Sequence, residues 1–229
     1  GFPIWADALQ SQAPRWKVVP VYRLSALRVA SAYRTVSNDA VCVIAGMVPI
    51  VVLAEERRFL YTRRRSTNLS SEELRAEERH HSIQRWQLLW DASSKGRWTH
   101  RLIPRLEVWL DRSHGQVNYY VTQMLSGHGC FREYLHKFKH EDSPDCPSCV
   151  GIRENAEHVF FVCPRFDVQR RVWEADVGET VEVGSLVEVM LSSEAAWDAT
   201  SVFATEVPPE RRAAHSAQWC NTPRLPRRC

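Results

Sequence analysis

CPSCVGIRENAEHVFFVC, residues 146–163, places three cysteines and one histidine close together in the chain. The four candidate ligands are Cys146, Cys149, His158 and Cys163, in the spacing C-x2-C-x8-H-x4-C. Zinc in proteins prefers four tetrahedral ligands drawn from thiolate sulfur and imidazole nitrogen. The alternative is a chance grouping of unrelated residues, but a paired C-x2-C followed by H-x4-C is a specific pattern. The stretch therefore predicts a zinc site.

The spacing also indicates which local structures must hold these residues. A C-x2-C pair on a tight turn can direct two sulfurs at one metal ion, and Pro147 and Ser148 suit such a turn. On an α-helix, residues five apart lie about 140° from alignment, so His158 and Cys163 need a turn or a helix end to face one ion. Four protein ligands close the coordination sphere, which favours a structural site over a hydrolytic one.

The remaining cysteines bear on the site and on the compartment. His128 and Cys130 are possible substitute ligands, although burial in a preceding helix is the simpler expectation for both. The chain has seven cysteines. An odd number without a signal peptide fits a reducing, intracellular compartment better than a disulfide framework.

Neither a membrane span nor a signal segment is evident. The longest apolar run, residues 41–54, is broken by Gly46 and Pro49 and is too short to cross a bilayer. The chain opens GFPIWADAL, without an initiator Met or a signal-like region, which is typical of a fragment of a longer protein.

Hydrophobic periodicity predicts a mainly α fold. Within the helix expected at residues 71–93, Ile83, Trp86, Leu89 and Trp90 lie three or four apart and are expected to be buried. Pro104 is expected in the first turn of a helix at 102–111. The other helices are expected at residues 22–33, 38–45, 50–65, 117–138 and 165–173, with one or two beyond Gly178. The helix at 117–138 is expected to be interrupted by Gly127 and Gly129, and residues 208–229 are predicted to be a disordered tail.

The charges around the cysteines are unevenly distributed. Residues 141–163 carry five acidic side chains and one basic side chain, a surface that repels phosphate at close range. Basic residues flank this segment, and the metal is therefore predicted to join two basic helices that make the phosphate contacts themselves. The candidates are Arg132, Lys137, Lys139, Arg165, Arg170 and Arg171, with a separate cluster at Arg63, Arg64 and Arg65. For that separate cluster, a solvated, basic helix C-terminus is an equally good explanation.

Other chemistry is not indicated. No adjacent pair of aspartates is present, so a two-metal polymerase site cannot be completed within this chain. His80 and His81 are expected on a solvated helix face. Three aromatic residues near the candidate ligands could stack on nucleic-acid bases, namely Phe160, Phe161 and Phe166. Burial in a hydrophobic seam beside the zinc is the preferred prediction for them.

Several motifs together resemble one family. They are AYRTVSNDAVCVIAGMVPI (32–50), LAEER (53–57), TQMLSGHGCFREYLHKF (122–138) and CPSC with AEHVFFVCPRF (156–166). In combination they resemble the C-terminal part of the Pol polyprotein, the second open reading frame, of non-LTR retrotransposons. The resemblance covers residues 1–205 and is greatest to the type-1, R-one-clade elements that insert into insect ribosomal DNA.

The resemblance implies a parent polyprotein with an RNA-directed DNA polymerase, an endonuclease and a C-terminal Cys/His segment credited with nucleic-acid binding. It implies structural Zn at the four ligands, Mg only in the parent polymerase, and nuclear and cytoplasmic localisation. The implied partners are element RNA, ribosomal target DNA and the rest of the polyprotein, with no membrane. Two features depart from the family pattern. The x8 spacer is longer than that of retroviral nucleocapsid knuckles, which argues against their base-stacking mode. The tail after Val207 does not resemble the family's usual basic helix, which indicates a frameshifted or degenerate copy.

Five segments are expected from these observations. Residues 1–65 would end a reverse-transcriptase region with thumb-like helices, and 66–140 would form a helical linker domain. The zinc knuckle and its flanking helix would occupy 141–173, C-terminal helices 174–207, and the basic tail 208–229. The predicted role is binding of nucleic acid for target-primed reverse transcription. The rival hypothesis is a zinc-stapled domain that packs on the polymerase without touching nucleic acid.

Overall fold

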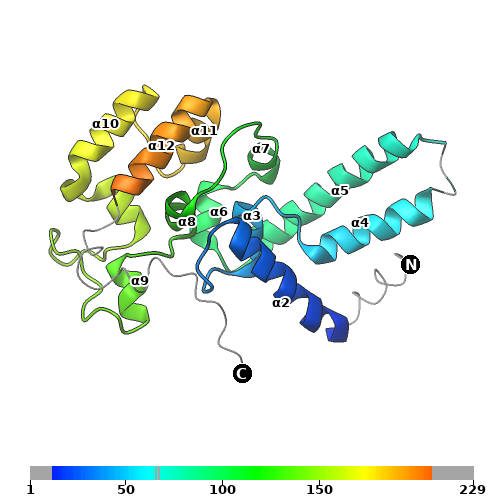
Figure 1. Cartoon of the computed structure of the whole chain (residues 1–229), viewed down its shortest axis with the longest axis horizontal. Coiled ribbons are helices and arrows are strands. Elements are labelled where there is room, and N and C mark those ends of the chain that lie inside the picture. Colours follow the sequence, from blue (N-terminus) through cyan, green and yellow to red (C-terminus); the bar gives the residue numbers. More distant parts are fainter. Residues whose placement is uncertain (1–11, 65, 67, 208–229) are drawn as a thin grey trace. The chain divides into compact units, whose positions relative to one another are not determined.

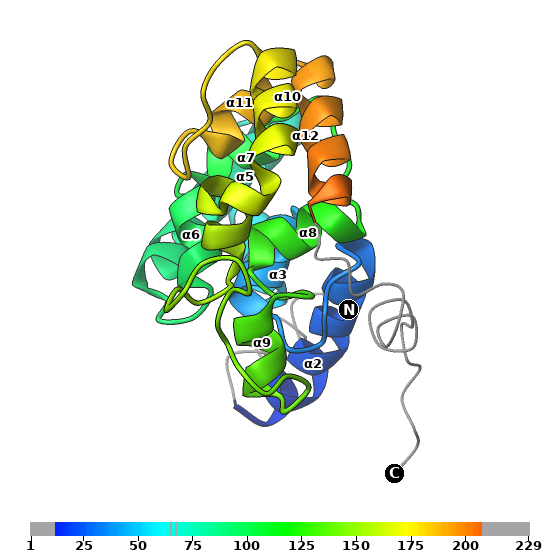
Figure 2. The ribbon, with the colours of Figure 1, turned by 90° about the vertical axis from the view of Figure 1, so that its left-hand side faces the viewer.

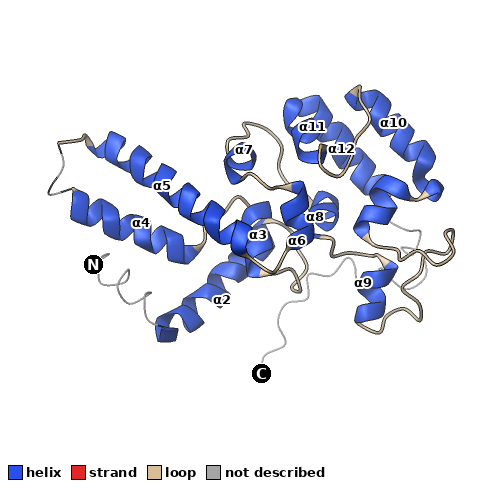
Figure 3. Cartoon of the chain, turned by 180° about the vertical axis from the view of Figure 1, so that it is seen from behind, coloured by secondary structure: helices blue, strands red, loops and turns tan. Residues whose placement is uncertain are grey.

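Helices make up the regular secondary structure of the described residues, as Figure 3 shows. The computed structural model describes residues 12–64, 66 and 68–207. Within them the predicted mainly α fold is confirmed, and the extended backbone pairs only in an isolated bridge between Asp145 and Arg153. The expectations for Arg65 and for the tail at 208–229 lie outside the described residues. The chain divides into two compact units, residues 1–126 and 127–229.

The first unit contains seven described helices (Figure 1). Local signals explain where two of them begin: the Ser37 hydroxyl accepts the Ala40 N–H at the start of α3, and Ser70 and Glu73 form a reciprocal capping box at the start of α5. The helices are α2 (Gln12–Val29), α3 (Asn38–Ile44), α4 (Ile50–Arg63), α5 (Ser71–Ala92), α6 (Arg97–Leu102), α7 (Leu106–Leu110) and α8 (Tyr119–Ser126).

The core of this unit forms around the short helix α3, which is buried from Ala40 to Ile44. Two large indoles pack into the core and donate to backbone carbonyls. Trp109 Nε1 donates to the Val43 carbonyl at 2.8 Å, and Trp90 Nε1 donates to the Ile103 carbonyl at 2.9 Å. Both rings are almost fully buried, so each satisfies its polar atom while contributing apolar contact.

Ion pairs join α4 and α5, which Figure 1 shows as an antiparallel hairpin. Arg63 contacts Glu78 at 2.6 Å and Glu77 at 3.1 Å, and Arg79 contacts the buried Glu56 at 3.1 Å. The basic end of α4 is therefore partly neutralised by its own neighbour in the fold.

The second unit contains the cysteine-rich segment and a group of three helices that lie side by side in Figure 2. Trp173 stacks on Phe203 with ring centroids 4.2 Å apart, and its Nε1 donates to the Thr200 hydroxyl at 3.0 Å. The elements are α9 (Arg132–Lys137), a π-helical turn (His158–Val162), a 3-10 turn (Pro164–Phe166), α10 (Asp167–Val177), α11 (Leu186–Ser192) and α12 (Glu194–Glu206).

Two details of the expected helices are wrong, and the interruption of a third helix is confirmed. Leu89 is 58% exposed, whereas Trp86 and Trp90 of the same helix are buried as expected. The reason is that α5 is buried along one face, and Leu89 lies beside that face. The buried residues are Leu74, Glu78, Ser82, Trp86 and Trp90. Pro104 lies between α6 and α7 and not inside one helix. The interruption expected at Gly127 and Gly129 within residues 117–138 is confirmed: α8 ends at Ser126, α9 begins at Arg132, and Gly127 has a φ of 67° that an L side chain rarely adopts.

No helix in the described part of the chain combines the length and the apolar character that a transmembrane span requires.

Candidate metal centre

The first two ligands lie on a tight hairpin between Pro144 and Glu154. The Cys146 N–H donates to the Ile152 carbonyl at 2.7 Å, and the Glu154 N–H donates to the Pro144 carbonyl at 2.9 Å. Gly151 completes the reversal with a φ of 73°, and a Cβ there would meet nothing within 4 Å, so its need for glycine is conformational and not steric. The predicted turn for the C-x2-C pair is confirmed.

The other two ligands are brought together by a π-helical turn. The Cys163 N–H donates to the His158 carbonyl at 2.7 Å, five residues back, in place of the four-residue step of an α-helix. This wider turn reduces the misalignment of about 140° that an α-helix imposes on residues five apart, and so brings Cys163 and His158 towards the same side. The Asn155 side chain accepts the His158 N–H at 2.9 Å and so caps the start of the segment.

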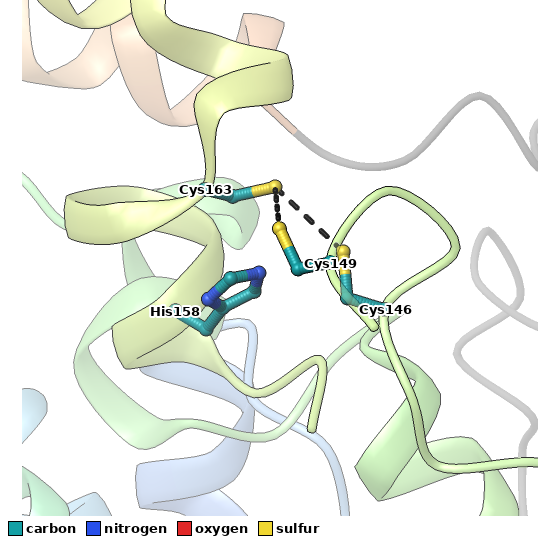
Figure 4. Close-up of side chains that lie close together, drawn as sticks. All are labelled: Cys146, Cys149, His158 and Cys163. Carbon is teal, nitrogen blue, oxygen red and sulfur yellow. Dashed lines mark hydrogen bonds between the residues drawn. The ribbon is translucent and has the colours of Figure 1, made fainter. Parts of the chain in front are cut away.

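The four ligand atoms converge, as Figure 4 shows. One ligand atom from each of Cys146, Cys149, His158 and Cys163 lies within 4.8 Å of the other three. The Cys163 sulfur is 3.7 Å from that of Cys146 and 4.0 Å from that of Cys149. Tetrahedral zinc with Zn–S bonds of about 2.3 Å requires sulfurs about 3.8 Å apart. The group can therefore hold a metal ion such as zinc without rearrangement of its sulfurs.

The polar atoms of the site fit a cation. His158 is buried and its Nε2 has no hydrogen-bond partner, an arrangement that is costly unless a ligand completes it. Burial, then the nearby charges of Arg165 and Arg170, lowers the pKa of His158 and favours the neutral ring that binds metals. Figure 4 shows a nitrogen of this ring directed towards the three sulfurs.

Burial shifts the pKa of the cysteine thiols upwards, opposite to the shift of His158. Burial raises the pKa of Cys163 to about 11, and the Arg165 backbone N–H opposes the shift. Burial also raises the pKa of Cys149. Buried thiols remain protonated unless a cation compensates the thiolate, and metal binding therefore displaces protons from them.

Buried Glu154 connects the hairpin to its flanking segments. Its Oε1 accepts the Arg132 N–H at 3.3 Å, and its backbone carbonyl accepts the Glu133 N–H at 3.1 Å, so it caps the start of α9. Its Oε2 accepts the Arg165 guanidinium at 3.1 Å, two residues beyond the last candidate ligand. The side chain is 1% exposed, so this carboxylate contributes a structural ion pair and not surface charge.

The function of Glu154 was missed by sequence reasoning, which counts it among acids that repel phosphate. A single acidic residue in a polar loop carries no periodic signal of burial. Its proximity to both Arg132 and Arg165 depends on the hairpin, because the three residues are far apart along the chain.

The predicted nucleic-acid-binding residues of this unit differ in their availability. Arg170 is buried, and its guanidinium donates to the carbonyls of Phe160 and Cys163, so it faces the backbone and not solvent. Arg171 is 77% exposed and pairs with Asp167 at 2.7 Å. Lys137 and Lys139 are exposed at the end of α9 and just beyond it.

The remaining predicted bases are partly engaged. The guanidinium of Arg132 donates to the Asp145 carbonyl at 3.3 Å and lies 4.0 Å from Glu141. In the first unit, Arg63 pairs with Glu77 and Glu78, while Arg64 is exposed. The structure thus places the predicted bases in two groups: one beside the candidate ligands, and one at the end of α4.

The aromatic residues beside the ligands form the expected hydrophobic seam. Phe160 is buried and makes edge contacts with Phe131 and Phe203, with ring centroids 6.0 and 5.9 Å apart. Phe166 is also buried, and the Arg165 guanidinium lies 4.6 Å from its ring centre. These rings connect the π-helical turn to the helical core and are not available as a base-stacking platform.

His128 lies outside the converging group, although it is the other histidine close in sequence. Its ring packs beside Tyr134, with centroids 5.1 Å apart. Burial, then the charge of Lys137, lowers its pKa to about 4 from an ordinary value of 6.5. His128 is not one of the converging ligands, but the expectation of burial in a helix is wrong, because it lies half-buried in the turn between α8 and α9.

His128 is expected to make stability depend on pH. Acid protonates the unfolded chain first, so stability is lost as the pH falls from about 6.5 towards about 4. At pH 5.5 the loss relative to pH 7.5 is expected to be about 1.3 kcal/mol. Denaturation at the two pH values with saturating zinc should show a loss about 1.3 kcal/mol larger in the unsubstituted chain than in His128→Asn, because proton release on zinc binding affects both proteins alike. The same pH dependence in both proteins would contradict the assignment.

Comparison with known proteins gives three informative similarities. The chain is 29% identical over 93% of its length to the 115 kDa protein in type-1 retrotransposable element R1DM of Drosophila melanogaster, covering 22% of that protein. It is 27% identical over 64% of its length to the Pol polyprotein from type-1 element R1 4 of Nasonia vitripennis, covering 40%. It is 30% identical over 53% of its length to the corresponding polyprotein of Bradysia coprophila, covering 12%.

The chain therefore spans less than half the length of these curated relatives. No protein-family model matches the chain, and no solved structure is significantly similar to it.

Proposed function

We propose that this chain, which is homologous to the Pol polyproteins of type-1 R1 retrotransposable elements of insects, is a zinc-ordered segment that grips nucleic acid. The zinc would be structural and would bind Cys146, Cys149, His158 and Cys163. The grip would come from basic side chains on the flanking segments and not from the hairpin that carries the ligands.

One observation carries this proposal: Glu154 joins the ligand hairpin to the start of α9 and to Arg165. Through these bonds, ordering the hairpin with a metal also orders the segments that carry the exposed Lys137 and Lys139. Phosphate groups are bound mainly by lysine and arginine, with an affinity that depends strongly on salt. We therefore assign the phosphate contacts to Lys137, Lys139, Arg171 and Arg64, with Arg132 and Arg165 as partly engaged contributors. Arg63 and Arg170 are excluded because their guanidinium groups are committed within the fold.

In the parent polyprotein, the same assignment implies a place beside an RNA-directed DNA polymerase with an endonuclease, acting on element RNA and ribosomal target DNA in nucleus and cytoplasm. Mg would serve the parent polymerase only. Nuclease activity in this segment is not supported, because among the described residues the one converging group of potential ligands has four protein ligands and no open position.

A second candidate function is packing on the rest of the polyprotein without contact to nucleic acid. This function is favoured by exposed apolar side chains in the second unit, which suit a protein partner. Among them are Val150, Val168 and Val172. The two functions predict different responses to salt.

Salt titration of binding to a single-stranded RNA and to a DNA duplex separates them. With about four phosphate contacts, affinity is expected to fall about 50-fold for the single-stranded RNA and about 150-fold for the DNA duplex between 50 and 200 mM salt. Lys137→Gln combined with Lys139→Gln should flatten the log–log slope by about 1.5, because two contacts are lost. Lys95→Gln, an exposed lysine of the first unit, is the matched control and should leave the slope unchanged. Binding that does not depend on salt, or no binding at all, would favour the packing function.

A further inference from the structure

The π-helical turn that aligns two of the candidate ligands lacks one regular backbone hydrogen bond at its end. In a regular α-helix, the Phe160 carbonyl would accept the N–H of residue 164, but that residue is Pro164 and has no N–H. The next N–H, from Arg165, is directed at the Cys163 thiol. Phe160 is buried, so its carbonyl needs another donor.

Arg170 supplies that donor from the first turns of α10. Its Nε donates to the Phe160 carbonyl at 3.1 Å, and its Nη2 donates to the Cys163 carbonyl at 2.9 Å. Asp167, three residues earlier on the same helix, lies 3.4 Å from Nη1 and orients the group. A planar guanidinium can bind two carbonyls at once in a defined direction, which a lysine ammonium cannot reproduce.

The two carbonyls mark the middle and the end of the segment between His158 and Cys163. Holding both of them maintains the wide turn, and the wide turn is what brings the imidazole and the Cys163 sulfur to the same point. The positive charge of Arg170 also lies close enough to affect His158. A site with three thiolates and one Zn²⁺ carries a net charge of about −1, so a buried guanidinium beside it is electrostatically favourable.

We propose that Arg170 is a positioning residue of the metal centre, which holds the π-helical turn in the conformation that aligns His158 with Cys163. This inference rests on the proposed metal site and extends it beyond the four ligands. It also reassigns Arg170 from phosphate binding, for which it was predicted, to the support of the ligands.

Zinc affinity of the full chain, measured by competition with a chromophoric chelator, tests the proposal. Arg170→Met keeps the length of the side chain and removes both donors, and it should weaken zinc binding about 10- to 100-fold. Arg170→Lys should give an intermediate loss, because one ammonium reaches at most one carbonyl well. Arg171→Met, at the adjacent exposed position, is the control and should stay within about twofold of the unsubstituted chain.

Substituting cobalt for zinc adds a readout of ligand geometry. The visible absorption of Co²⁺ bound to three thiolates and one imidazole should change in Arg170→Met and remain unaltered in Arg171→Met. Thr200→Val, which removes the hydroxyl that pairs with Trp173 in the same unit, controls for general destabilisation and should leave both zinc affinity and the cobalt spectrum unchanged.

Equal zinc affinity and an equal cobalt spectrum in Arg170→Met and Arg171→Met would overturn the role of Arg170. An equal loss of zinc affinity in Thr200→Val would overturn it too, because the effect would then be general stability. Absence of zinc binding in the unsubstituted chain would instead overturn the proposed metal site, and the inference with it.

Discussion

Cys163→Ser is expected to lower the zinc affinity of this chain by two to three orders of magnitude. Structural zinc sites contribute about 10–16 kcal/mol in isolated zinc-finger peptides, or roughly 2.5–4 kcal/mol for each of four ligands. Cys163 is fully buried, and its sulfur lies close to the sulfurs of Cys146 and Cys149. With serine in its place, the site has no room for a substitute ligand. Chelator competition and metal analysis of the purified chain measure this effect.

Loss of the metal should unfold only part of the unit. With the proposed ligands on the hairpin and the π-helical turn, these two segments are expected to depend on the ion, whereas α10, α11 and α12 share an apolar core in which Trp173 stacks on Phe203. Hydrogen exchange should therefore lose protection at the amides of Cys146 and Glu154 after chelation and keep it along α10.

Cys42→Ala is the matched control for this experiment. Cys42 is a buried cysteine of the first unit and is not one of the four candidate ligands. Its substitution should cost stability through a cavity but leave the zinc content at one ion per chain. Zinc content unchanged by Cys163→Ser would contradict the proposed ligand set.

Glu154→Ala is expected to destabilise the second unit by about 3 kcal/mol. Removing one member of a buried charged pair typically costs about 3–5 kcal/mol, and the value is reduced here because Arg165 reaches solvent. The substitution also leaves the Arg132 N–H at the start of α9 without its acceptor. Chemical denaturation measures the loss, and hydrogen exchange along α9 locates it.

The same variant separates metal binding from its consequence. None of the four ligands is removed, so zinc should still bind, within about tenfold of its original affinity. Nucleic-acid affinity should fall further than zinc affinity, because α9 loses its attachment to the hairpin. Equal protection of α9 in Glu154→Ala and in the unsubstituted chain would refute the coupling.

Two variants refine the interpretation. Glu154→Gln keeps an oxygen that can accept the Arg132 N–H and removes the charge that pairs with Arg165, so it should cost about 1 kcal/mol. Asp142→Asn removes an exposed acid from the same segment and should have almost no effect on stability. A large effect of Asp142→Asn on nucleic-acid affinity would indicate a role for surface charge in place of helix positioning.

Much of the candidate metal centre could be predicted from the sequence. The four ligands, the tight turn for Cys146 and Cys149, and the need for a special turn between His158 and Cys163 follow from residue types, spacing and helix geometry. Each of these is a local property, and the structure confirms the two turns and brings the ligand atoms together. The assignment of the four as zinc ligands stays a prediction until the metal is measured.

The division into five segments also stays a prediction, since the two compact units describe the chain at a coarser level. Helix existence was predictable wherever capping residues and apolar spacing agree, as in α3 and α5. Leu89 was misjudged because its spacing from Trp86 suits either side of the buried face, and only the packing of the whole helix decides which side is covered.

The sequence by itself therefore determined a mainly helical chain, its likeness to R1 Pol polyproteins and a group of three cysteines and one histidine that can hold a metal ion. Tertiary structure alone decided which charges are free. Arg63, Arg165 and Arg170 look alike in a list of bases, yet ion pairs or backbone carbonyls occupy their guanidinium groups, and Glu154 is buried where a surface acid was expected. The physical reason is that a charged side chain is committed by partners distant in sequence, and the hairpin and the packed helices bring those partners within reach.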